Sequence, residues 1–242
     1  MKHIGKAWGM IIGIIVLIST SVLSIQAAPA PVSVTADQME FNGQAQTITA
    51  AGHVVVSRGT TKITGQQARY HIQRDVAELT GHPVLTQPGL LIQAKKVGVY
   101  QQQHVVADGG VYIKQKDKEI KGNKVDYLIS REYGIITGNA FLQAQGYQLH
   151  ADKIEAWLGA VKAIGTGRVR IYSATDRLHA SGNQAVYTQT PGKDDGVLVL
   201  TGNVSATQRK SMFRGEAVQV RRRDESIRTF SRSTIVISPS QS

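Results

Sequence analysis

The stretch LTGNVSATQ, Leu200–Gln208, closely repeats an earlier one, LTGHPVLTQ, Leu79–Gln87. Both begin with Leu, Thr and Gly and end with Thr and Gln. A catalytic motif normally occurs once in a chain, whereas a recurring stretch is typical of a repeated structural unit. The near-copy therefore predicts a repeat architecture.

The glycine of this stretch recurs about every 29 residues. The second and fourth residues after it are apolar or proline, and the residue directly after it is never a large hydrophobe. This alternation with a period of two predicts a strand with one buried face. The glycines are Gly52, Gly81, Gly109, Gly138, Gly167 and Gly202, and a degenerate further copy is expected at Ser233, with Ile235 and Ile237.

A second motif alternates with the first and is centred on an alanine or glycine. Apolar residues lie two positions before this small residue and three and five positions after it, so the apolar register slips by one residue. Such a slip is typical of a β-bulge or a sharp bend, where a small residue avoids a clash. The small residues are Ala36, Gly65, Ala94, Gly122, Ala151, Gly182 and Gly215.

Composition supports a folded, basic protein. The chain has 242 residues, 24 glycines, no cysteine and a net charge of +11. It is too apolar for a disordered chain and long enough to bury its own core without disulfides. No sustained helical periodicity and no linker interrupts residues 32–238, so we expect one all-β domain there.

The N-terminus is predicted to be a signal peptide, residues 1–27. Lys2 and Lys6 precede an uncharged apolar run, and small residues follow, with a cut expected after Ala27. The alternative is an uncleaved membrane anchor over Ala7–Ile25, a stretch close to the length of a transmembrane helix. Either way, the remainder of the chain is expected to be exported.

Several of the repeated segments resemble the OstA-like family. The resemblance is carried by VTADQMEF, AAGHVVVSRGTTKITGQQARY, EIKGNKVDY, ITGNAFLQAQGYQLHADKIEAW and LTGNVSATQ. It implies an open, twisted β-jellyroll of stacked antiparallel strands that binds lipopolysaccharide in the periplasm. It also implies end-to-end joining with related jellyrolls: an anchored inner-membrane protein, an outer-membrane translocon, or further copies of the same chain.

The residues themselves give such binding a physical basis. Each buried CH₂ group of an acyl chain gains roughly 0.8 kcal/mol, so a continuous apolar groove could shield the acyl chains of lipid A without any chemistry. The alternative is that the same residues form an ordinary closed core. The candidate groove residues are Met39, Phe41, Val54, Val56, Ile63, Tyr70, Leu85, Val111, Ile113, Leu142, Val169 and Ile171.

No motif indicates an enzyme, a cofactor or a metal site. The sequence contains no G-x-S-x-G, no H-E-x-x-H, no Walker A motif and no cysteine. Asp194 and Asp195 lie in a stretch typical of a turn. Arg221–Arg223 could suggest nucleic acid, but export and the lack of interleaved aromatics argue against it. Lys and Arg at the rim of a groove could instead pair with phosphates of lipid A.

Three other functions remain open from the sequence. The chain could be the anchored inner-membrane member of the same family. It could be a carbohydrate-active parallel β-helix, although no acidic residue recurs at a repeat position. It could also be a scaffold that polymerises through its strand edges and binds no lipid.

Overall fold

The structure is a computed structural model. It describes residues 33–237 except 59, 102, 116–117, 145, 158, 175–176, 194, 209–210, 222–225 and 231–232. The predicted signal peptide, residues 1–27, lies outside the described residues. The limits of the predicted domain, 32 and 238, lie just outside them and stay predictions.

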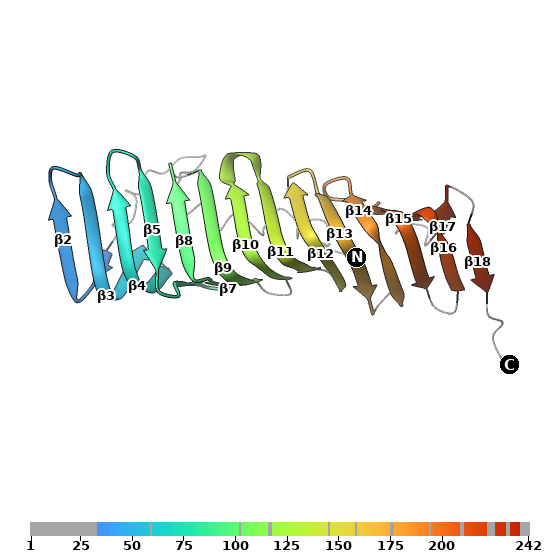
Figure 1. The fold of residues 1–242 in the computed structure, drawn as a ribbon, viewed down its shortest axis with the longest axis horizontal. Helices are drawn as coiled ribbons and strands as arrows, with labels where there is room; N and C mark the ends of the chain where they lie inside the picture. The colour runs from blue at the N-terminus through green and yellow to red at the C-terminus, as the bar shows by residue number, and fades with distance from the viewer. Residues whose placement is uncertain are drawn as a thin grey trace.

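The described chain forms one 18-stranded antiparallel sheet, in which each long strand pairs with strands that precede and follow it in sequence (Figure 1). A single turn of 3-10 helix, Ile129–Arg131, connects two of them. The first strands are β1 (Ser33–Thr35), β2 (Gln38–Asn42), β3 (Thr47–Arg58), β4 (Thr61–His71), β5 (Val76–Thr80), β6 (Val84–Gln87), β7 (Leu90–Gln93), β8 (Lys96–Tyr100) and β9 (His104–Gln115). The remaining strands are β10 (Lys118–Leu128), β11 (Tyr133–Ala144), β12 (Tyr147–Trp157), β13 (Lys162–Ser173), β14 (Leu178–Thr188), β15 (Val197–Gln208), β16 (Ser211–Arg221), β17 (Ser226–Thr229) and β18 (Thr234–Ile237).

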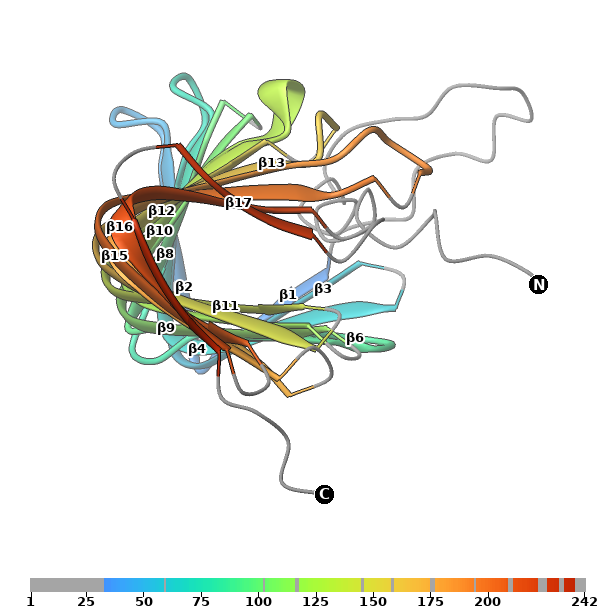
Figure 2. The ribbon, with the colours of Figure 1, turned by 90° about the vertical axis from the view of Figure 1, so that its right-hand side faces the viewer.

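Each long strand bends near its middle, so the sheet is folded along its length into two arms. Seen from the end, the arms diverge from the bend and the cross-section is C-shaped (Figure 2). The predicted open, twisted β-jellyroll of stacked antiparallel strands is confirmed.

The bend is made by the recurring glycine and the residue after it, and both have positive φ. In β13 the φ angles are 76° at Gly167 and 45° at Arg168, and in β15 they are 77° at Gly202 and 53° at Asn203. Glycine adopts this left-handed region readily, and asparagine tolerates it better than bulky residues do. This requirement explains why no large hydrophobe follows the glycine.

The register confirms the slip predicted at the second motif. Between β13 and β14, Thr166 faces Gln184 and Val169 faces Gly182, so two residues of one strand oppose one residue of the other. The same shift recurs at each complete repeat, as a β-bulge that turns the strand. At Gly182 an added Cβ would lie 3.1 Å from the carbonyl oxygen of Thr201, so this corner leaves little room for a side chain.

The second repeat is interrupted where Pro83 occupies the position that is valine or alanine in the other repeats. β5 ends at Thr80 and β6 begins at Val84, whereas β3 runs without a break through its own bend. Proline has no N–H to donate to the ladder, and this accounts for the gap.

The prediction of a further copy at Ser233 is wrong in register by two residues. In the preceding repeat, the residue four positions after the glycine, Ala206, faces Phe213. Ile235 also faces Phe213, so Ile235 takes that fourth position and not the second. The copy is split into β17 and β18, because its sequence lacks the glycine that bends an unbroken strand.

Inward-facing side chains of the two arms pack against each other in the C-terminal half. Ile154, Leu200, Val218 and Ala206 are fully buried. Their cluster extends from Ile136 on β11 to Val218 on β16. Burial of this surface stabilises the sheet by about 25 cal/mol per Å².

We expect Gly202→Ala to destabilise the protein more than Gly89→Ala does. Both glycines have a φ of 77°, but an added Cβ would lie 2.7 Å from Asn183 Nδ2 at Gly202 and would meet nothing within 4 Å at Gly89. The left-handed alanine costs about 1 kcal/mol in either variant, and the clash adds about 1–2 kcal/mol. Urea unfolding measures the difference; equal midpoints for the two variants would show that the corner contact is not restrictive.

Candidate functional site

The inner surface of the folded sheet is a trough with apolar walls. In each arm, inward-facing residues of neighbouring strands lie directly opposite one another in register. In one arm Val56 faces both Val34 and Ile63, and Ile63 also faces Leu85. These cross-strand pairs form continuous apolar rows along the sheet. Across the 14 strands of the arm that runs from β2 to β17, the trough is roughly 60 Å long at the usual strand spacing.

The predicted groove residues all line this inner surface, but their exposure varies along its length. Val54, Val111, Leu142, Val169 and Ile171 are buried. Another group is half-buried: Val56, Ile63, Leu85 and Ile113. The remaining three, near the N-terminal end, are exposed: Met39 (59%), Phe41 (62%) and Tyr70 (36%).

Exposed apolar side chains therefore form a continuous inner patch at the N-terminal end. Phe41 faces Ile48, and Ile48 faces Tyr70 on the next strand. Val34 and Met39 add to this patch from β1 and β2. At the C-terminal end the inward-facing Ile235 is also exposed (52%), whereas between the two ends Leu200 and Ile154 are completely buried. The trough is thus open to solvent at its ends and filled by its own side chains between them.

The candidate groove residues chosen from the sequence did not include about half of the residues that line the inner surface. Residues two and four positions before each bend glycine also point inward, for example Ala50 and Ile48 in β3 and Leu200 in β15. The signal was present, because these positions are also apolar or glycine in every complete repeat. They belong to the same period-two alternation, read upstream of the glycine.

One polar group lies within the inner wall. The Tyr127 side chain faces inward and is 3% exposed, and its hydroxyl has no hydrogen-bond partner among the described residues. Burial raises the pKa of this phenol well above its ordinary value. An unpaired buried hydroxyl typically costs about 1–3 kcal/mol, so this position is not optimised for core stability alone.

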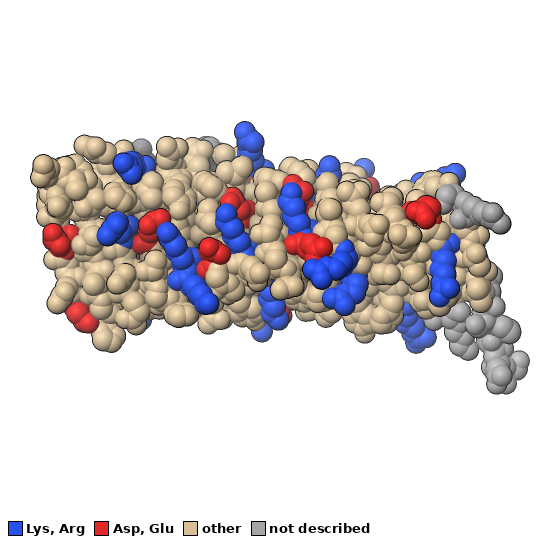
Figure 3. Space-filling view, in the orientation of Figure 1, with Lys and Arg blue, Asp and Glu red and all other residues tan. Residues whose placement is uncertain are grey.

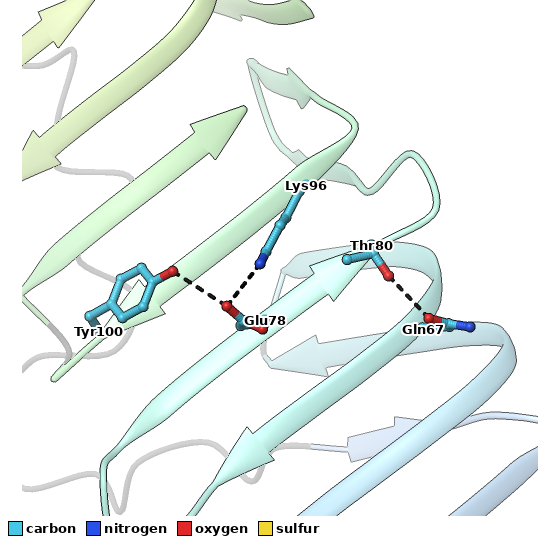
Figure 4. A network of polar contacts seen from close by, with 5 residues as sticks. All are labelled: Gln67, Glu78, Thr80, Lys96 and Tyr100. Carbon is cyan, nitrogen blue, oxygen red and sulfur yellow. Dashed lines mark hydrogen bonds and ion pairs between the residues drawn. The ribbon is translucent and has the colours of Figure 1, made fainter. Parts of the chain in front are cut away.

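The outer face carries charged and hydrogen-bonded pairs in place of apolar ones. Glu78 on β5 accepts a hydrogen bond from Lys96 Nζ at 2.9 Å and one from the Tyr100 hydroxyl at 3.4 Å (Figure 4). Nearby, the Thr80 hydroxyl donates to Gln67 at 3.4 Å. The Lys96 contact lowers the pKa of Glu78, and Glu78 in turn raises the pKa of Lys96.

The outer side of the bend is polar as well. Figure 3 looks onto this side and shows Lys and Arg in a band along the sheet, with acidic side chains among them. His53 Nδ1 lies 2.7 Å from Asp37, and Arg168 Nε donates to Asp152 at 2.8 Å. The Arg168 hydrogen bond lowers the pKa of Asp152. These pairs join the residue after the bend glycine to the opposing strand, so they are structural contacts.

The described residues show neither a metal site nor a membrane-spanning helix. They contain no group of three or more His, Asp or Glu side chains that could hold a metal ion. They also contain no helix long and apolar enough to cross a membrane. Asp194 and Arg222–Arg223, which the sequence raised as chemical candidates, lie outside the described residues.

Single-cysteine variants should distinguish the two ends of the trough, because the chain has no native cysteine. Met39→Cys should react with a maleimide as fast as the outward-facing control Glu40→Cys. Leu200→Cys should react at least about tenfold more slowly, since labelling there needs local opening. Equal rates at Met39 and Leu200 in the folded protein would contradict a packed C-terminal half.

Replacing Glu78 should reduce the loss of stability in acid. The folded-state pKa of Glu78 is lowered, so its contribution is present above its unfolded pKa and is lost as the pH falls through the folded value. Glu78→Gln should lower the free energy of unfolding by about 0.5–1 kcal/mol at pH 7 and by less at pH 3. Urea unfolding at both pH values measures this; a deficit that stays constant would show that the carboxylate charge is not responsible.

Comparisons with known proteins find similar sequences among lipopolysaccharide export proteins. The curated relatives include the lipopolysaccharide export system protein LptA of Escherichia coli K12 and that of Shigella flexneri, each 28% identical over 124 residues. The matched region covers 51% of this chain and 58% of those relatives, so the chain matches little more than half of their length. A solved structure, the periplasmic LptA homologue LptH of Pseudomonas aeruginosa, covers 59% of this chain and 94% of that chain with a TM-score of 0.33 and 17% identity.

A family model matches more than half of the chain. Residues 33–160 match the model described as LptA/(LptD N-terminal domain) LPS transport protein. This region includes the first three complete bends and the open end of the trough. The resemblance to OstA-like proteins is confirmed, and the chain belongs to the LptA/LptD N-terminal domain family of lipopolysaccharide transport proteins.

Proposed function

We propose that this protein is a periplasmic bridge that carries lipopolysaccharide toward the outer membrane with the acyl chains of lipid A in its trough. The observation that carries the proposal is the open inner patch at the N-terminal end, where Met39 and Phe41 are more than half exposed. Large side chains of this kind are normally buried, and an exposed apolar patch typically marks a binding surface.

The shape of the trough fits a lipid with several chains. Its inner rows are apolar and continuous along the sheet, so an acyl chain can lie against them wherever the trough is open. Each CH₂ group removed from water contributes roughly 0.8 kcal/mol, and no bond needs to be made or broken. We therefore propose transfer without catalysis or a cofactor.

The packed half of the trough requires a further step. Ile154 and Leu200 leave no room for a chain between the arms. Passage through this half therefore needs the arms to separate and the side chains of the core to be replaced by those of the ligand. We propose that lipid is first received at the N-terminal end, where the exposed inner patch formed by Met39, Phe41 and Ile48 needs no such displacement.

The two ends of the sheet are the proposed contacts with partners. β2 lies at one end of the array and β18 at the other (Figure 1). An edge strand offers backbone groups to another strand, so a related jellyroll could continue the sheet and the trough together. The proposed partners are the anchored inner-membrane and outer-membrane proteins of this transport system, or a second copy joined head to tail.

Photo-crosslinking in cells tests whether lipid occupies the trough. p-Benzoylphenylalanine at Phe41 or Val56, which point inward, should give a lipopolysaccharide adduct. At the outward neighbours Glu40 and Ser57 it should not. Adduct formation at Phe41 but not at Glu40 separates binding in the trough from adsorption to the outer surface.

The scaffold hypothesis predicts a different pattern. If the protein is folded and exported and none of the four positions gives an adduct, lipid binding is contradicted. A self-adduct at Phe41 without lipid would favour polymerisation through the strand edges.

A further inference from the structure

A row of aromatic and basic side chains crosses the outer surface of the arm that follows the bends. Tyr112 faces Lys121, Lys121 faces Phe141, Phe141 faces His150, and His150 faces Arg170 on successive strands from β9 to β13. Such cross-strand neighbours have Cβ atoms about 5 Å apart, so the side chains form one continuous surface. These side chains lie on the face of the sheet opposite the apolar trough, so they do not line it.

The side chains of this row are in mutual contact. Lys121 Nζ lies 5.6 Å from the ring centroid of Tyr112 and 5.3 Å from that of Phe141. The rings of Phe141 and His150 are 4.8 Å apart and tilted by 47°. Burial, with Arg170 and Lys121 nearby, lowers the pKa of His150, so its ring is uncharged at neutral pH. The result is a platform of rings in which Lys121 is paired with Glu119, so Arg170 supplies the unpaired positive charge among the described residues.

This platform runs into a groove on the outer side of the bend. The groove has a volume of about 540 Å³, and His150 and Arg170 belong to both the row and its wall. Three carboxamides, Asn139, Asn183 and Asn203, line the groove from separate strands. Each carboxamide can donate and accept hydrogen bonds, so together they can bind several hydroxyl groups.

The groove also holds an uncompensated positive charge. Arg168 is paired with Asp152, whose carboxylate accepts its Nε–H at 2.8 Å. Arg170 has no ion-pair partner among the described residues and is exposed. A free guanidinium beside hydrogen-bonding groups is suited to a carboxylate or a phosphate, which it can bind through two parallel hydrogen bonds.

We propose that this outer groove binds an acidic saccharide chain. Sugar rings have an apolar face that can lie on the aromatic platform and hydroxyls that can reach the carboxamides. The acidic group would pair with Arg170. The groove is of the size that encloses small ligands in proteins, typically about 300–1,000 Å³.

The position of the groove separates it from lipid held in the trough. The groove lies outside the bend, whereas the arms diverge from the bend on the other side (Figure 2). Sugars attached to a lipid in the trough would leave between the arms, away from Arg170. The saccharide that reaches the groove is therefore not that of the lipid held by the same chain, and the inference does not depend on lipid binding.

Titration calorimetry with two acyl-free saccharides tests the proposal and distinguishes the source. One probe is the carboxylate-bearing glycan released from cell wall by muramidase, and the other is the phosphorylated saccharide of lipopolysaccharide with its acyl chains removed. We expect binding of at least one probe by the full chain and a loss of about tenfold or more in Arg170→Gln. Arg214→Gln is the matched control, because Arg214 is exposed, faces Ser205 on the same outer surface and lies outside the groove.

A second variant tests the aromatic platform. Phe141→Leu keeps an apolar side chain but removes the ring, and we expect saccharide binding to weaken by about threefold to tenfold. Binding of neither probe, or equal binding by wild type, Arg170→Gln and Phe141→Leu, would overturn the proposal. Preferential binding of a single-stranded oligonucleotide would also overturn it, since bases stack on aromatic rings as well.

Discussion

The bend at each repeat depends on two consecutive residues in the left-handed region of backbone space. Only a glycine followed by a residue that tolerates positive φ, such as Gly138 and Asn139, allows a strand to turn without leaving the sheet. The side chain of the opposing strand then occupies the space that a Cβ would need; at Gly138 it is that of Asn123. The bulge therefore divides one flat sheet into two arms, and the arms create an inner and an outer surface.

The same inner positions act as core at one end and as open surface at the other. In the C-terminal half the two arms close on each other, and inward residues of both arms form a buried cluster. In the first repeats several equivalent residues remain accessible. Val34 and Phe41 occupy strand positions equivalent to those of Ala180 and Tyr187, yet their environments differ. A groove and a closed core are thus not exclusive alternatives for this chain.

Much of the fold could be predicted because each repeat is specified by residues that are close together in the sequence. The glycine, the small residue of the second motif and the period-two alternation each impose a local geometry, and all three are found at the expected places. The break at Pro83 also follows from a single residue. The split C-terminal copy could not be placed, because without a glycine the register of Ile235 depends on pairing with Phe213.

The site was less accessible from sequence than the fold. Alternation shows which side chains share a face, but it does not show how closely the two arms approach. The sequence therefore could not show that Met39 is exposed whereas Ile171 is buried. The outer groove was missed for a related reason, since Asn139, Asn183 and Arg170 become neighbours only when three strands are aligned in register.

The bend has a consequence for how such a protein can change over evolutionary time. Each bend is specified within one strand pair, and each long strand contacts mainly the strands next to it in sequence. A repeat could be duplicated or lost without redesigning the others, as in other one-dimensional repeat proteins. The length of the molecule is then set by the number of copies of a unit of about 29 residues, so homologous proteins could differ in length by whole repeats.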